Sequence, residues 1–184
     1  MAVGEKPGMG EKMGELLYNK PWILQRADPY VYRHTDGTYY FTASVPAYDG
    51  IVLRKSDTLA GLADAPETEV WHKHESGIMS CHIWAPELHY INGAWYIYYA
   101  GGDKDDIWQI RPYVLECKNE DPITGTWTEK GKMGRADDDD FSFEAFSLDG
   151  TVFENHGKWY YIWAEKVGVG KQISNLYIGE LETP

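Results

Sequence analysis

The sequence is poor in cysteine. It contains two, Cys81 and Cys117, among 184 residues, and neither belongs to a CxxC motif. Two cysteines do not make a disulfide framework, so we expect free, buried thiols. The histidines and carboxylates also lack the tight spacing of metal ligands. No zinc site is therefore predicted.

Long apolar runs are absent as well. No stretch approaches the length needed to span a membrane. The first 17 residues are rich in Gly, Lys and Glu and have no apolar segment of the kind found in signal peptides. We expect residues 1–17 to be a flexible lead-in to a domain that covers 18–184. The predicted location is cytoplasmic, or secreted if a signal has been removed.

Positive charge is scarce. The chain has 17 Lys and Arg residues against 29 Asp and Glu residues, which gives a formal net charge of -12. Phosphate groups would be repelled, so the composition disfavours nucleic acids and anionic membrane surfaces as partners. A neutral partner fits this charge better.

Aromatic residues, in contrast, are abundant at 15%, with 8 Trp and 14 Tyr. Strand cores account for most of such a surplus, because aromatic side chains favour strands. The remainder suits a sugar-binding surface, since an aromatic face packs against the apolar C–H face of a sugar ring.

Three segments repeat one pattern of strand, tight turn and aromatic-rich strand: residues 28–42, 86–99 and 149–163. Their turns end in Gly37, Gly93 and Gly157, and Asp-Gly and Asn-Gly pairs are strong hairpin signals. The spacing between the glycines leaves room for about four strands per unit, as in a propeller blade. The fold class predicted is all-β. Propellers have about four to eight blades, so three units imply an incomplete ring, a ring completed by other chains, or another arrangement.

Two aspartates begin equivalent units and are candidates for catalysis. Asp28 precedes a proline and Asp149 precedes a glycine. Glycosidic bonds are usually cut by paired carboxylates, and equivalent positions around an axis bring such groups together. The alternative is that both aspartates only cap turns, as Asp beside Pro or Gly commonly does.

Residues 26–32, 83–90 and 146–153 resemble the signature stretches of glycoside hydrolase family 43, and arabinofuranosidase-like members most of all. The resemblance covers most of the chain from about Pro21. It implies a five-bladed β-propeller, of which this chain covers about three blades. It also implies no required cofactor, although some family members hold a calcium or other ion in the central channel.

The resemblance assigns roles to both aspartates. Asp28 corresponds to the general base, which activates water for an inverting attack. Asp149 corresponds to the residue that tunes the pKa of the general acid. The family's acid is a Glu in a Glu-Gly-Pro-like motif, which this sequence lacks. Glu144, Glu154 and Glu165 lack that context, so none is assigned the role, and this chain alone is expected to show little turnover.

Four further residues are predicted to bind substrate. Trp84 corresponds to the family's aromatic wall, with a core tryptophan as the alternative, while Ser44, Ala43 and His82 are expected around the same pocket. The predicted function is removal of α-L-arabinofuranosyl groups from arabinan or arabinoxylan, so the partner is an arabinose-containing saccharide. The alternatives are a β-xylosidase and a non-catalytic sugar-binding fragment.

Overall fold

The computed structural model describes residues 21–166 and 174–184, and the regular secondary structure of this part is almost entirely antiparallel strand. The predicted lead-in, residues 1–17, lies outside the described residues. A single 3-10 turn, η1 (Ala60–Ala63), interrupts the strands of this part. No helix in the described ranges is long and apolar enough to cross a membrane.

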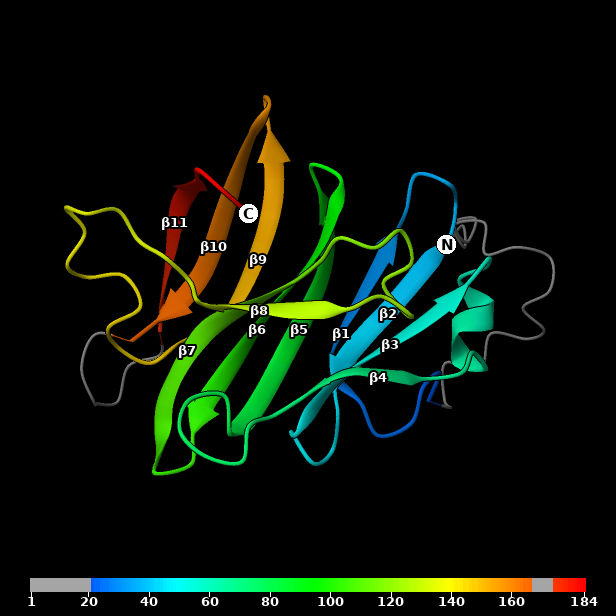
Figure 1. The fold of residues 1–184 in the computed structure, drawn as a ribbon, viewed down its shortest axis with the longest axis horizontal. Helices are drawn as coiled ribbons and strands as arrows, with labels where there is room; N and C mark the ends of the chain where they lie inside the picture. Colours follow the sequence, from blue (N-terminus) through cyan, green and yellow to red (C-terminus); the bar gives the residue numbers. More distant parts are fainter. Residues whose placement is uncertain (1–20, 167–173) are drawn as a thin grey trace, which may run out of the picture.

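The strands form three sheets that lie side by side (Figure 1). The first contains β1 (Ala27–Arg33), β2 (Tyr39–Ser44), β3 (Gly50–Ser56) and β4 (Thr68–His72) in that order. The second contains β5 (Cys81–Ile91), β6 (Ala94–Asp103), β7 (Asp106–Cys117) and β8 (Trp127–Lys132). The third contains β9 (Ser147–Asn155), β10 (Lys158–Glu165) and β11 (Asn175–Leu181). Each sheet starts with one of the three predicted hairpins, as expected for successive blades.

The hairpin turns lie at the predicted positions and differ in width. Ile91 pairs with Ala94 across a two-residue turn in which Asn92 and Gly93 both have positive φ. The third hairpin is equally tight, because Asn155 pairs with Lys158. The first is wider, since Arg33 pairs with Tyr39. Adjacent positive φ values are typical of the two-residue turns whose twist matches that of the strands.

Most of the aromatic surplus is core, as the composition indicates. One cluster joins the first two sheets around Trp95, and another joins the second and third around Tyr98 and Tyr161. Both cysteines are free: Cys117 is buried, whereas Cys81 is only partly buried. The two clusters hold neighbouring blades together through large side chains, so their innermost strands keep fixed relative positions.

The three innermost strands, β1, β5 and β9, each carry a bulge at the same place. Two residues of the inner strand oppose one residue of its neighbour, and the pairs are Asp28-Pro29, Ala85-Pro86 and Asp149-Gly150. The first residue of every pair has positive φ, between 45° and 52°. Asp adopts this conformation more readily than most residues, and bulges redirect side chains next to functional sites.

Candidate active site

The three bulges border one hollow of about 230 Å³, which we call the axial hollow. Its lining residues are Asp28, Pro29, Tyr30, Ala85, Glu87, Asp149 and Gly150. Every one of them lies in or directly after a bulge of an innermost strand. The two aspartates predicted from the sequence, 121 positions apart by their numbering, are therefore brought to one site.

Asp28 is held by a hydrogen-bond chain that crosses between two blades. The Ser44 hydroxyl donates to Oδ2 of Asp28 at 2.8 Å. The same hydroxyl oxygen accepts the backbone N–H of Ala85 at 2.8 Å. Ser44 is buried, so these contacts fix the carboxylate orientation through Oδ2, and Oδ1 can accept a further partner.

Asp149 has a raised pKa. Desolvation by the surrounding protein is the main cause, and the negative charge of Asp28 adds to it. The next residue, Gly150, lets the strand pass close to the buried Tyr161, because a Cβ at that position would collide with the Tyr161 hydroxyl. The charge of Asp28 influences Asp149 because both residues line the same hollow.

This coupling gives a prediction. Asp28→Asn is expected to lower the pKa of Asp149 toward its ordinary value, because the amide carries no charge. The folded state binds the Asp149 proton more tightly than the unfolded chain does. The wild type therefore loses stability as the pH rises through the range just above the ordinary Asp pKa, and Asp28→Asn should lose less.

A carboxyl-carbon NMR titration of both proteins measures the shift. Asp36 is the internal control: the backbone N–H of Thr38 donates to it and lowers its pKa, and it lies in the first hairpin turn. Its titration should be unchanged in Asp28→Asn. An Asp149 curve that does not move would show that the two carboxylates are not coupled.

Glu87 is a third carboxylate in the hollow, which the sequence reasoning missed. Its Oε2 lies 3.1 Å from Nε2 of His89, and Nδ1 of that ring lies 3.4 Å from the Tyr30 hydroxyl. His89 is buried, and burial and the charge of Glu87 raise the pKa of Tyr30. The i, i+2 spacing of Glu87 and His89 on one strand places both on one face, which is a signal that the sequence did contain.

The remaining predicted residues are not among those that line the hollow. Ser44 contacts it indirectly, through its hydrogen bond to Asp28. Ala43 is fully buried and packs in a cluster with Phe41 and Leu62, so the structure does not place it at the hollow. His82 and Trp84 stack on each other, with ring centroids 4.5 Å apart, directly before Ala85. Trp84 is only partly buried, and its role as an aromatic wall stays a prediction.

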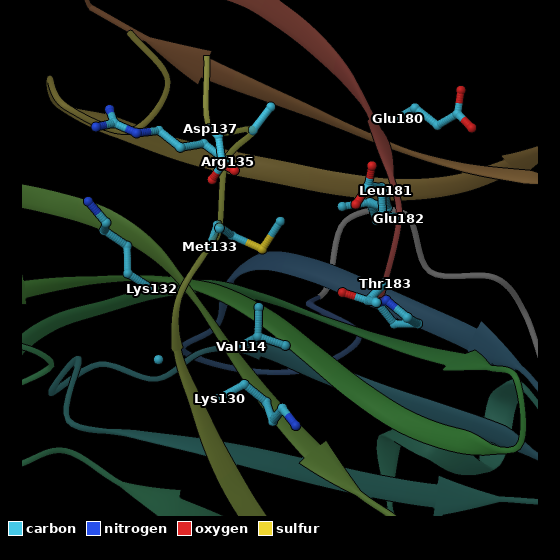
Figure 2. A pocket seen from close by; sticks show the side chains of 14 residues that line it. Val114, Lys130, Lys132, Met133, Arg135, Asp137, Glu180, Leu181, Glu182 and Thr183 are labelled. Atoms are coloured by element: carbon cyan, nitrogen blue, oxygen red, sulfur yellow. The ribbon is translucent and has the colours of Figure 1, made fainter. Parts of the chain in front are cut away.

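A larger hollow of about 630 Å³ lies elsewhere, between β8 with the segment after it and the C-terminal residues. Lys132 and Arg135 extend away from the C-terminal residues in Figure 2. Arg135 pairs with Glu144 at 2.7 Å, and Glu180 pairs with Lys158 at 2.8 Å. These charged groups already have partners outside the hollow, and none of the predicted site residues lines it. Size alone therefore does not make this hollow the active site.

Within the described ranges, no three His, Cys, Asp or Glu side chains come together in a way that could hold a metal ion. A calcium ion in the central channel stays a prediction.

Blades arranged about an axial hollow that carboxylates line define a β-propeller fold. The chain belongs to glycosyl hydrolase family 43, whose model matches residues 18–184. The predicted fold class is confirmed: the chain is all-β and covers about three blades of the family's five-bladed propeller.

Three relatives show how far the similarity extends. The extracellular exo-α-(1→5)-L-arabinofuranosidases of Streptomyces avermitilis and Streptomyces chartreusis are each 47% identical, over 92% and 91% of this chain and 34% and 49% of their own lengths. The crystal structure of an α-L-arabinofuranosidase from Lactobacillus brevis superposes with a TM-score of 0.79 at 49% identity, covering 89% of this chain and 51% of that one. The chain thus spans a third to a half of the length of these proteins.

The predicted cytoplasmic location is wrong. Both Streptomyces relatives are named extracellular enzymes, which points to secretion. The physical reason is that export depends on a targeting segment, so the composition of a folded domain does not report its compartment.

Proposed function

We propose that this chain is the part of an inverting exo-acting α-L-arabinofuranosidase that carries the general base. The enzyme removes terminal arabinofuranosyl groups from arabinan or arabinoxylan. One observation carries the proposal: Asp28 and Asp149, from the first and third innermost strands, line the same hollow and are electrostatically coupled. The identity to named arabinofuranosidases supports arabinose as the sugar.

In the proposed reaction, Asp28 accepts a proton from water through the oxygen that Ser44 leaves free. The water oxygen then bonds to the anomeric carbon from the face opposite the leaving group, while the glycosidic C–O bond breaks. The leaving oxygen takes its proton from a general acid, for which the family uses a Glu in a motif that this sequence lacks. The negative charge of Asp149 favours the protonated form of that acid.

Glu87 is assigned a binding role. One of its oxygens faces the buried His89 ring, which fixes the carboxylate orientation. The other oxygen is left as an acceptor for a sugar hydroxyl at the floor of the hollow. The part of the hollow that these three blades border, about 230 Å³, has room for a pentose unit.

A product assay by NMR tests this function on the protein encoded by the complete reading frame. With arabinan and arabinoxylan oligosaccharides, we expect release of single arabinose units whose first detected anomer is β. Release of xylose from xylan oligosaccharides would instead establish a β-xylosidase. Binding without any release would establish a sugar-binding protein, and a first product with the α configuration would contradict the inverting mechanism.

A further inference from the structure

A row of aromatic side chains connects segments next to the axial hollow. Its members, in order of contact, are Tyr48, Trp84, His82, Trp108 and Phe146, and we call them the aromatic track. Successive ring centroids lie 4.5–6.3 Å apart. The track draws on four separate segments, so tertiary structure rather than local sequence assembles it.

Two members of the track are exposed to solvent. Trp108 is 63% exposed and Tyr48 is 39% exposed, although aromatic side chains elsewhere in the structure are mostly buried. Exposed aromatic groups gathered in one place are typical of a binding surface. Two contacts fix the track in position: Nδ1 of His82 lies 3.0 Å from the carbonyl oxygen of Ile107, and the Ile83 N–H donates to the carbonyl of Tyr48.

The track is also continuous with the hollow. Trp84 directly precedes Ala85, which lines the hollow, and Phe146 lies at the entry to the strand that carries Asp149. The nearby β6–β7 turn consists of Lys104 and Asp105, and Asp106 begins β7. The ammonium group of Lys166 lies 4.9 Å from the ring centroid of Phe146. Aromatic rings with both acidic and basic groups beside them suit neutral sugar rings, whose C–H faces stack on aromatic faces.

We infer that the aromatic track binds the neutral pentose polysaccharide from which the terminal sugar is removed, with Trp108 as its outermost stacking platform. This inference rests on the proposed function and adds a binding site outside the hollow. The sugars next to the cleaved bond lie along the track, while the terminal unit occupies the hollow. Trp108 contributes to polymer affinity and takes no part in the chemical step.

Affinity electrophoresis of the full-length protein in gels that contain arabinan tests this inference. Trp108→Ala is expected to weaken retardation by roughly 3- to 10-fold in apparent Kd, the size expected when one stacking platform is lost. Trp108→Phe retains a ring face and should keep most of the retardation. Trp22→Ala is the matched control, because Trp22 is also exposed, at 44%, but packs on Phe41 outside the track.

Kinetics separate this inference from the proposed function. Trp108→Ala should raise KM on arabinan by a similar factor and leave KM on a small aryl arabinofuranoside unchanged. Equal retardation of Trp108→Ala and wild type would overturn the inference that the track binds the polysaccharide, even if both proteins hydrolyse arabinan. If retardation depends on Trp108 but the protein shows no turnover, the track does bind the polysaccharide and the proposed hydrolysis is refuted. Circular dichroism of the variants confirms that they are folded.

Discussion

Asp28→Ala in the complete enzyme is expected to lower kcat by about 10²- to 10⁴-fold, the usual cost of losing a general base. The proposed attack needs a group that removes a proton from water on one face of the sugar, and Asp28 is placed for that role by the Ser44 hydroxyl. KM should change little, because the base acts mainly in the transition state. Steady-state kinetics on an aryl arabinofuranoside measure both values.

Azide distinguishes a missing base from a damaged site. Azide is a nucleophile that needs no deprotonation, so it should restore turnover in Asp28→Ala and give an arabinosyl azide of inverted configuration. Asp36→Ala is the control, since Asp36 lies in an exposed hairpin turn, and it should keep wild-type activity. Near-normal turnover of Asp28→Ala without azide would remove Asp28 from the mechanism.

The repeat pattern predicted the elements that position the site. Alternating aromatic strands and the turn glycines placed the three inner hairpins correctly, because hairpin geometry depends on local backbone preferences. Equivalent positions in those repeats then brought Asp28 and Asp149 together. The bulges that direct both side chains were not predicted, since a bulge depends on pairing with the neighbouring strand.

Ala43 and Ser44 illustrate what strand geometry excludes. Both were expected beside the pocket, yet successive residues of a strand point to opposite faces. Ser44 points toward Asp28, so Ala43 must point the other way, and it is buried near Leu62. Alternation alone could have shown that both cannot line one pocket.

The aromatic track is a feature that no local pattern could have revealed. His82 and Trp84 stack at the start of β5, where the strand is irregular and His82 has positive φ, so simple strand alternation does not predict their contact. Trp108 and Phe146 join them only because the β6–β7 hairpin and the start of β9 lie next to the start of β5. Contacts between blades depend on the packing of whole sheets, which the sequence pattern does not specify.

Glu165 is the carboxylate whose loss should most damage the fold. It is completely buried at the end of β10 and is not a lining residue of the axial hollow. Its oxygens accept the backbone N–H groups of Phe143 and Ala145, each at 3.0 Å, and the indole N–H of Trp163 at 2.8 Å. These bonds tie the segment before β9, and hence the approach to Asp149, to the third sheet.

Glu165→Ala should therefore lower the free energy of unfolding by roughly 3 kcal/mol or more, because each buried donor left without a partner costs about 1–3 kcal/mol. Glu165→Gln should cost less, since one oxygen remains to accept. Glu154→Ala is the control: Glu154 is exposed and accepts one turn N–H, from Gly157, so its loss should cost less than ~1 kcal/mol. Urea unfolding followed by tryptophan fluorescence measures all three variants. Equal stability of Glu165→Ala and Glu154→Ala would mean that water replaces the carboxylate, and that Glu165 does not hold the segment leading to Asp149.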